Sequence, residues 1–302
     1  MCGRYASARK RLELLEEFQV RREHADPELP PDYNVAPTKP VYAVLTRSEH
    51  RDRAAGPGGP DGQRRQDEPS GDQPARQLRV LRWGLVPSWA KDPAIGSRMI
   101  NARAETVAEK PSFRRAFARR RCLLPADGYY EWQAAGPDAG AAPADLPPGQ
   151  QGEAAPRGRA GKRGAPKVPY FIHPRGCGVL ALAGLYELWR RPGDGAGGDG
   201  DPWLWTVTII TTSAVDELGR IHDRMPMVIE RSRWADWLDP ALNRPDEVRE
   251  LLVPAAAGGL DVYPVSPAVN NVRNNGPGLI EPAQSEVTSP GDGASGSPGP
   301  LF

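Results

Sequence analysis

Cysteine at position 2 is the side chain in this sequence that is best suited to covalent chemistry. Initiator methionine is removed when the following side chain is small, and the product here would carry a thiol and a free α-amine on adjacent carbons. The α-amine, with a pKa of about 7.7–8.0, is partly unprotonated at neutral pH, and the thiol is a strong nucleophile. Such a 1,2-aminothiol could attack a carbonyl through sulfur or condense with an aldehyde to a thiazolidine. We predict that Cys2 is an active-site nucleophile; the alternative is an incidental residue in a frayed terminus.

Three further polar residues stand in otherwise apolar or rigid segments: Asn101 in INARAET, Glu131 in LLPADGYYEW and His222 in IHDRMP. The aromatic neighbours of Glu131 would raise the pKa of its carboxyl group towards the range used in general acid–base catalysis. His222 could exchange protons near neutral pH. Taken singly, each also has a structural interpretation, as a core histidine with satisfied hydrogen bonds or as a carboxylate in an ion pair.

Residues 79–125 are strongly basic, although the whole chain of 302 residues has a formal net charge of only +1. The segment contains eleven Lys and Arg residues against three acidic ones, a net charge of +8, and its aromatic residues lie among these charges. Basic residues interleaved with aromatic ones are typical of a surface that binds the phosphates and unstacked bases of a single strand. The alternative is a solvated helix face around residues 113–121, with the aromatic residues in the core.

The hydrophobic pattern predicts that these residues are positioned by a scaffold built mainly from strands. Short runs rich in Val, Ile, Leu and aromatic residues, bounded by Pro and Gly, occur at 39–46, 77–86, 168–174, 178–189 and 204–214. Helices are predicted at 7–20, 112–120, 230–239 and 245–253, the second of them capped by Ser112. Because strands exceed helices and the connections are hairpin-like, we predict a mainly antiparallel α+β fold.

Long polar stretches interrupt this pattern. Residues 48–77 and 134–167 contain almost no large apolar side chains, and a shorter stretch at 192–201 is rich in Gly and Asp. Such stretches cannot bury enough apolar surface to offset the entropy lost on ordering. We therefore predict one domain over residues 1–285, with disordered insertions at 48–77 and 134–167 and a disordered tail at 286–302.

The remaining cysteines and the histidines indicate neither a disulfide scaffold nor a metal site. Cys122 and Cys177 stand in apolar or Gly-flanked runs and are predicted to be core residues, and the four histidines lack the spacing of metal ligands. No cofactor is implied. Because no run approaches eighteen apolar residues and the N-terminus lacks the apolar stretch of a signal peptide, we expect a cytoplasmic protein with no membrane partner. The few apolar positions in its loops favour a monomer.

Seven motifs occur in order along the chain: MCGRYA, YNVAP, RWGLVPSW, INARAET, CLLPADGYYEW, IHDRMP and VSPAVNNVRNNGP. Together they resemble the SOS response-associated peptidase (SRAP) family, the abasic-site processing proteins. The resemblance extends over nearly all of the chain outside the polar stretches, and the motifs are specific as a set. It implies barrel-like twisted sheets, mainly antiparallel, with a few peripheral helices.

The resemblance implies a protein that binds single-stranded DNA carrying an abasic site, including sites near single-strand/duplex junctions. Cys2, freed by removal of Met1, would condense with the ring-opened sugar aldehyde and leave a thiazolidine crosslink that shields the lesion. By motif, Asn101 would hold the sugar-derived part and the ring. Glu131 would transfer protons during attack, dehydration and Met1 release, and His222 would help to open the sugar and reverse the adduct. Self-removal of Met1 and lyase-type activity are also implied.

Five residues are implied as DNA contacts. Arg4 and Arg103 would bind the phosphates that flank the lesion, because a planar guanidinium suits bidentate contact with phosphate. Asn34 of YNVAP belongs to the same expected surface. Trp83 or Trp89 would stack against an unpaired base or wedge beside it, with a place in the core as the alternative.

Three other functions fit parts of the sequence. An N-terminal-nucleophile amidohydrolase would also use Cys2 and its α-amine, but it does not predict the motifs around Asn101, Glu131 and His222. A non-catalytic single-strand binding module would leave Cys2 incidental. A protease acting on other proteins would need a peptide-binding cleft, of which the sequence gives no sign.

Overall fold

The computed structural model describes residues 2–25, 27–47, 73–134, 167–176, 178–190, 203–215, 218–255 and 258–283. The predicted tail, most of both predicted insertions and Cys177 lie outside these residues. The predicted insertion boundaries are too wide, because residues 75–77 belong to a strand and residues 134 and 167 pair with each other across two strands. Polar strand ends are stabilised by pairing that composition does not reveal. Gln77, for example, is completely buried and donates to the Arg47 carbonyl at 3.1 Å.

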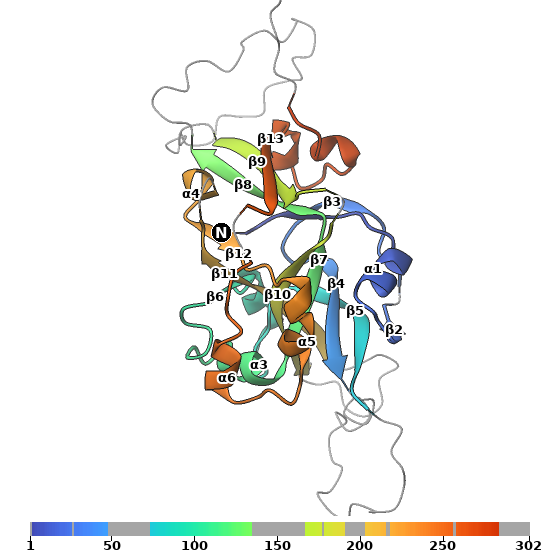
Figure 1. Cartoon of the computed structure of the whole chain (residues 1–302), viewed down its shortest axis with the longest axis vertical. Helices are drawn as coiled ribbons and strands as arrows, with labels where there is room; N and C mark the ends of the chain where they lie inside the picture. The colour runs from blue at the N-terminus through green and yellow to red at the C-terminus, as the bar shows by residue number, and fades with distance from the viewer. Residues whose placement is uncertain are drawn as a thin grey trace, which may run out of the picture.

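Five strands close into a barrel, the lower part of the molecule in Figure 1. In ring order they are β11, β10, β7, β4 and β5, and β5 pairs back to β11. All pairs are antiparallel except the closing one. The bounds are β4 Pro40–Arg47, β5 Ala75–Trp83, β7 Arg121–Ala126, β10 Leu180–Arg190 and β11 Trp203–Ser213. β4, β5, β10 and β11 overlap four of the predicted apolar runs, whereas β7 lies outside all of them.

Three short strands extend the barrel sheet. β2 (Arg22–His24) pairs with β5, and β6 (Asn101–Arg103) pairs with β11, both in parallel. β12 (Arg224–Pro226) pairs with β11 in the antiparallel direction. Thus β11 carries two of the motif segments, INARAET and IHDRMP, at the same end.

A second sheet lies against this end of the barrel (Figure 1). It is antiparallel throughout, with the order β13, β9, β8, β1 and β3. The bounds are β1 Tyr5–Ser7, β3 Asp32–Val35, β8 Gly128–Ala134, β9 Lys167–Pro174 and β13 Leu260–Pro264. The two sheets confirm the predicted α+β class with mainly antiparallel, barrel-like sheets.

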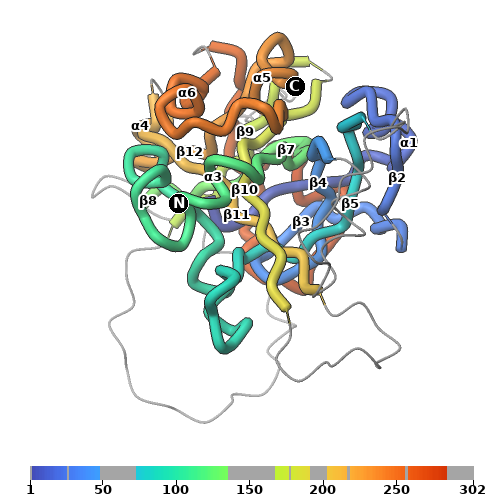
Figure 2. Tube along the Cα trace, turned by 90° about the horizontal axis from the view of Figure 1, so that it is seen from below, coloured from blue at the N-terminus to red at the C-terminus, as the bar shows by residue number. Residues whose placement is uncertain are grey.

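The helices are short and peripheral. They are α1 Arg11–Glu17, α3 Arg114–Arg119, α4 Leu218–Ile221, α5 Trp234–Leu238 and α6 Pro245–Arg249, with 3-10 turns at Pro93–Arg98, Arg231–Arg233, Pro267–Asn270 and Pro277–Leu279. Figure 2 shows α5 and α6 together, well away from α1. Ser112 does not cap α3, because that helix begins one residue later than predicted, after Phe113, without a side-chain cap. No helix among the described residues is long and apolar enough to cross a membrane.

The strands alternate between two apolar clusters. On β10, Ala183 and Leu185 pack outward under the helices, in the cluster that contains Phe117 and Trp237. Tyr186 and its inward-facing neighbours belong to the cluster inside the barrel. This period of two is what a strand buried on both faces requires. Because the barrel wall is covered by apolar clusters on both faces, solvent reaches the barrel at its ends rather than through its wall.

Candidate functional site

Cys2 lies at the end of the barrel that faces the second sheet. The segment after it enters β1, which is held between β3 and β8. Cys2 is completely buried and belongs to the barrel cluster together with Tyr5 and Trp83, whose rings meet edge to face at 5.3 Å. Burial is the main reason that the pKa of the Cys2 thiol is raised well above its usual range, and the nearby Glu131 carboxylate adds to the effect. The thiol therefore needs a partner that removes its proton.

Asn101 is brought to Cys2 by the parallel pairing of β6 with β11. The register places Asn101 opposite Ile209. Its side-chain Nδ2 donates a hydrogen bond to the Cys2 carbonyl at 2.7 Å. Its Oδ1 is buried and has no hydrogen-bond partner among the described residues. A buried amide oxygen that lacks a partner costs free energy, and this one is an acceptor beside Cys2.

Glu131 reaches the same place from β8. Tyr5 pairs with Tyr129, and the Tyr130 amide donates to the Arg4 carbonyl at 3.0 Å, so the next residue of β8 runs alongside the N-terminal segment. Glu131 is only 4% exposed. Burial raises the pKa of its carboxyl group to about 7, against the lowering effect of the positive N-terminus. At neutral pH this carboxyl is close to half-protonated, so it can both accept and release a proton.

His222 follows α4, and its pKa is lowered, first by burial and then by the positive charge of the N-terminus. Its Nδ1 lies 3.0 Å from the Arg224 amide, which donates to it, and 2.7 Å from a carboxylate oxygen of Asp223. A ring nitrogen carries either a proton or a free lone pair. Nδ1 therefore cannot both accept a hydrogen bond from the Arg224 amide and donate one to the Asp223 carboxylate. The lowered pKa favours the neutral ring, in which Nδ1 accepts from Arg224 and Nε2 carries the proton.

The structure thus brings all four predicted catalytic residues to one end of the barrel. Asn101 contacts Cys2 directly, and Glu131 acts on the pKa of the Cys2 thiol. The His222 segment joins them because α4 packs on β8, where Gln133 donates to the Arg220 carbonyl at 3.1 Å. In Figure 1 the start of the chain lies beside α4, β8 and β12. The arrangement combines a buried thiol, an amide, a carboxyl group with a raised pKa and an imidazole.

Asn34 requires a correction. It is completely buried, and Oδ1 accepts from Arg4 at 2.6 Å while Nδ2 donates to the carbonyls of Val269, Asn271 and Asn274 at 3.3, 3.0 and 3.0 Å. Because both of its polar atoms are used internally, Asn34 cannot contact DNA in this structure. It fastens the loop at 269–274 and orients Arg4.

Replacing Asn34 by alanine should therefore act mainly on stability. Removing a buried side chain that makes these bonds leaves polar groups unpaired and should lower the free energy of unfolding by about 1–3 kcal/mol. Chemical denaturation measures this, with the exposed Asn243→Ala as a control that should be neutral. Unchanged stability together with weakened DNA binding would restore Asn34 as a DNA contact.

The predicted role of Trp83 is also corrected, because its ring is completely buried and Nε1 donates to the Ile100 carbonyl at 2.9 Å. A ring in this position cannot stack on a base; it holds the residue that precedes Asn101. Trp89 is 59% exposed and remains available for stacking. Arg103 is exposed on β6, two residues beyond Asn101. Arg4 is partly buried, and its guanidinium also donates to the Val269 carbonyl and lies 5.6 Å from the Trp132 ring.

Two residues in the quoted motifs escaped the predictions. Arg224 of IHDRMP makes a bidentate ion pair with Glu105 at 2.6 and 3.0 Å and donates to the Thr211 carbonyl. Its partner Glu105 belongs to INARAET, so the pair joins the two motifs. Trp132 of GYYEW lies under Arg4 and donates to Asn270 at 2.6 Å. The sequence signal that could have identified these two residues is their position within the quoted motifs.

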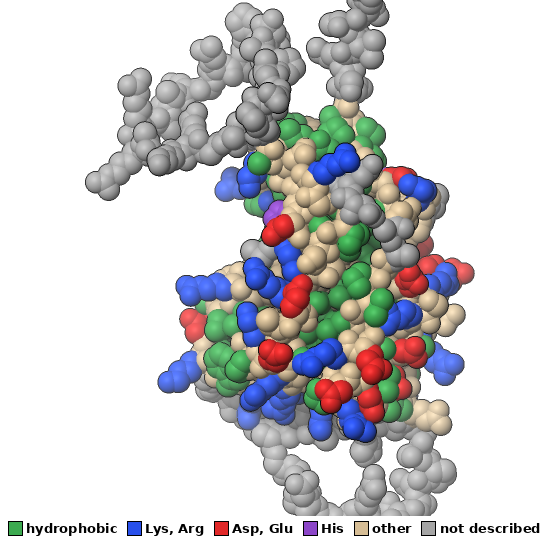
Figure 3. All heavy atoms as spheres, turned by 60° about the vertical axis from the view of Figure 1, so that its left-hand side comes forward, with side chains coloured by type: hydrophobic (Ala, Val, Ile, Leu, Met, Phe, Trp, Pro, Cys, Tyr) green, Lys and Arg blue, Asp and Glu red, His purple; other side chains and the backbone are tan. Residues whose placement is uncertain are grey.

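The basic segment does not form one band at this site. Figure 3 turns the left-hand side of Figure 1, where the chain begins, towards the viewer, and Lys and Arg side chains there alternate with acidic ones. Arg103 lies at the Cys2 end of the barrel, whereas Arg115, Arg119 and Arg120 line a cavity elsewhere. Among the residues with defined positions, no group of three or more His, Cys, Asp and Glu side chains could hold a metal ion.

Comparison with known proteins identifies relatives over most of the chain. A family model described as SOS response associated peptidase (SRAP) matches residues 1–148 and 156–272. The abasic site processing protein YoqW of Bacillus subtilis is 34% identical over 281 residues, which cover 93% of this chain and 99% of YoqW. The abasic site processing protein HMCES of Gallus gallus is 32% identical over 239 residues, covering 72% of this chain and 60% of HMCES.

Solved structures support the fold. A crystal structure of a protein from Bacteroides thetaiotaomicron has a TM-score of 0.63 at 22% identity and covers 94% of this chain and 100% of its own. A second, from Bordetella bronchiseptica, has a TM-score of 0.58 at 22% identity, covering 88% and 100%. At this level of identity the likeness concerns the fold alone.

Proposed function

The chain belongs to the SOS response-associated peptidase family, and we propose that it processes abasic sites in single-stranded DNA by forming a covalent adduct through Cys2. The relatives named above are abasic site processing proteins, which supports the substrate class. The exposed Arg103 and Trp89 and the partly buried Arg4 are the side chains offered to the phosphates and bases around the lesion. Sites next to a duplex junction belong to the same proposal.

The proposed reaction joins the aminothiol to the open-chain aldehyde of the abasic sugar. Hydrolysis of the peptide bond before Cys2 first releases Met1 and frees the α-amine. The amine attacks the aldehyde carbon, and loss of one water gives an imine. The sulfur then adds to the imine carbon while the thiol proton passes to nitrogen, which closes a thiazolidine ring. Water is the one product of the condensation, and no atom changes its oxidation state.

Each neighbour of Cys2 has a step in this sequence. Glu131, with a carboxyl pKa of about 7, takes the thiol proton and delivers protons to the leaving water. The neutral His222 gives and takes the proton that opens the closed sugar and, in the reverse direction, helps to release the adduct. The buried Oδ1 of Asn101 accepts from the freed amine or from a sugar hydroxyl. Cleavage of the DNA strand by a lyase-type step would use the same imine.

The observation that carries the proposal is the hydrogen bond from Asn101 to the Cys2 carbonyl beside a buried carboxyl that titrates near pH 7. The backbone carbonyl next to the proposed reactive amine and thiol is thereby held by a residue from a distant part of the chain, and a carboxyl group from another part lies near the thiol. An incidental terminal residue does not need such an arrangement.

An incubation with three single-stranded oligonucleotides tests the proposal. One carries a single abasic site, one carries the same site after borohydride reduction, and one is undamaged. We expect a band of retarded mobility on a denaturing gel with the first oligonucleotide alone, since the reduced site has no aldehyde. Intact mass should show the loss of Met1 in the adduct. An adduct with all three, or hydrolysis of glutamine without any adduct, would refute the proposal in favour of another Cys2 chemistry.

A further inference from the structure

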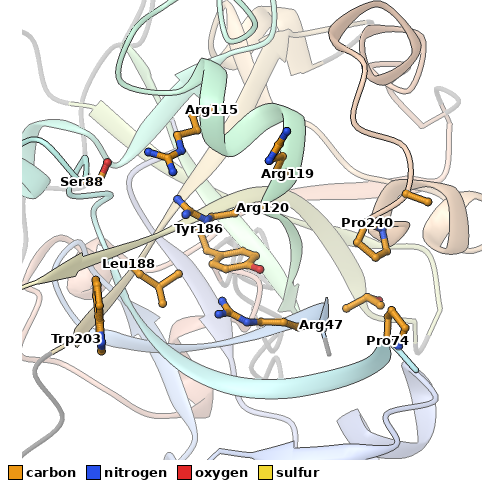
Figure 4. Close-up of a pocket in the computed structure, with 12 residues that line it drawn as sticks. Arg47, Pro74, Ser88, Arg115, Arg119, Arg120, Tyr186, Leu188, Trp203 and Pro240 are labelled. Atoms are coloured by element: carbon orange, nitrogen blue, oxygen red, sulfur yellow. The ribbon is translucent and has the colours of Figure 1, made fainter. Parts of the chain in front are cut away.

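The barrel end that faces away from Cys2 opens into a cavity of about 610 Å³ (Figure 4). β11 links the two ends, because Ile209 pairs with Asn101 beside Cys2, whereas Trp203, six residues earlier, lines the cavity. At about 3.3 Å per residue, the two places are roughly 20 Å apart along the strand. The barrel is packed between them, since a Cβ on Gly184 would lie 2.3 Å from the nearest side-chain atom. The cavity is therefore separate from the Cys2 site.

Two arginines take inward-facing positions near this open end. Arg47 lies two residues after Leu45 on β4, and Arg79 lies two residues before Leu81 on β5. Since Leu45 and Leu81 face the inside of the barrel, both arginines take positions on the same inward face. Both guanidinium groups lie over the ring of Trp205, at 5.1 and 4.4 Å from its centroid. Arg79 Nε also donates to Gln77 Oε1 at 2.9 Å. The two guanidinium groups are held by ring and hydrogen-bond contacts, and they give this end of the barrel positive charge.

Further cations come from α3 and the residue that follows it. Figure 4 shows Arg115 and Arg119 on the helix, Arg120 below them and Arg47 on the opposite wall. Arg120 is paired with the buried Glu187. For Arg115 and Arg119 no carboxylate lies within ion-pair distance in the part of the chain that the structure describes. Both side chains are exposed, so their donors are free to meet an anion at the cavity rim.

The remaining wall is apolar and aromatic. Leu188 and Trp203 lie side by side at one end of the cavity, and Tyr186 lies between them and the cationic side (Figure 4). Tyr186 is buried and stacks on Trp205 with a centroid distance of 5.8 Å. A partly exposed indole facing guanidinium groups offers a planar surface and a phosphate contact in one cavity. The volume lies within the range of pockets that enclose a small ligand.

We propose that this cavity binds a nucleotide, with the phosphate on Arg115 and Arg119 and the base against Trp203 and Leu188. The nucleotide can come from two sources, a free mononucleotide or a residue of a bound DNA strand. The inference does not rest on the proposed chemistry of Cys2, since neither source needs an aldehyde. Mouths of β-barrels are among the preferred places for such sites.

The test uses the full-length protein and two probes, dADP and an undamaged fifteen-residue oligothymidylate. Calorimetry for dADP and fluorescence anisotropy for the oligonucleotide give the dissociation constants. For the probe that represents the natural source of the nucleotide, Arg115→Glu should weaken binding at least tenfold, and Trp203→Ala should weaken it at least threefold. The matched control is Arg114→Glu, because Arg114 is exposed on the same helix, carries the same charge and does not line the cavity. It should stay within twofold of wild type.

The outcomes separate the sources. Loss of dADP binding in Arg115→Glu, but not in Arg114→Glu, supports a site for free nucleotides; the same pattern with the oligonucleotide alone supports a strand contact. Equal effects of the two charge reversals, or no binding of either probe, would overturn the inference. It would also be overturned if inorganic phosphate displaced dADP at equal concentration and Trp203→Ala had no effect. Thermal melting of each variant confirms that it is folded.

Discussion

Replacing Cys2 by alanine should abolish the adduct with abasic-site DNA, lowering its yield on a denaturing gel by at least about a thousandfold. The alanine variant keeps an α-amine after Met1 is removed, so it can still form an imine, but it has no sulfur with which to close the ring. An imine is hydrolysed under denaturing conditions, whereas a thiazolidine persists. Noncovalent affinity for the same oligonucleotide should change by less than threefold, because the Cys2 side chain is buried and uncharged and the alanine variant keeps the α-amine.

Cys122 provides the matched control for this loss. It is a second completely buried cysteine of the same barrel cluster, and burial likewise raises the pKa of its thiol. Cys122→Ala should leave the adduct yield within twofold of wild type and lower the free energy of unfolding by about 1 kcal/mol, for a small cavity in the barrel. If the adduct persists in Cys2→Ala and disappears in Cys122→Ala, the nucleophile has been assigned to the wrong cysteine.

The long strands β4, β10 and β11 were predictable from sequence, but β7 and the closure of the barrel were not. Apolar runs bounded by Pro and Gly mark β4, β10 and β11 within two residues of their ends. The pairing of β5 with β11 joins Trp83 to Val207, residues more than a hundred positions apart. It is also parallel in a mainly antiparallel sheet. Periodicity reports which face of a strand is apolar, and it carries no information about which distant strand it meets.

The residue types and motifs predicted the chemistry of the site residues, but they did not predict which of these side chains are exposed. The resemblance implies that Trp83 contacts DNA, with a place in the core as the alternative, yet Trp83 alternates with Leu81 on the inward face of β5. That alternation was visible in the sequence and favours the core. Asn34 has no such signal. Its partners are backbone carbonyls at 269–274, and backbone groups leave no trace in the sequence.

The basic segment 79–125 shows the same limit on the scale of the whole molecule. Its net charge of +8 is correct, but the chain folds it around the barrel, so that Arg103 and Arg115 lie on different parts of the surface. A run of charge along the sequence predicts one binding surface only where the run is a single helix or strand. Here it comprises all or part of three strands (β5, β6 and β7), turns and the helix α3.

Replacing Glu131 by glutamine should slow adduct formation by about 10²- to 10⁴-fold, the range that a positioned acid–base group contributes. Glutamine has nearly the same shape but cannot take the thiol proton or return one to the leaving water. The wild-type rate should change with pH around the carboxyl pKa of about 7, and the variant should lose that dependence. Single-turnover rates between pH 5 and 9 measure both effects. The exposed Glu247→Gln on α6 should match wild type throughout.

The same substitution should make the protein more stable in alkaline solution. Burial favours the protonated form of Glu131, so the folded state binds this proton more tightly than the unfolded state does. Below about pH 4.5 both states are protonated and the residue has no effect. As the pH rises from there to about 7, wild type loses up to about 3 kcal/mol, whereas glutamine stays neutral. Denaturation at pH 4 and pH 8 should show equal stability at the first and a more stable variant at the second. A carboxylate kept for structure would give the opposite sign at pH 8. A gain in stability with a loss of rate therefore identifies Glu131 as a group retained at a cost for its chemistry.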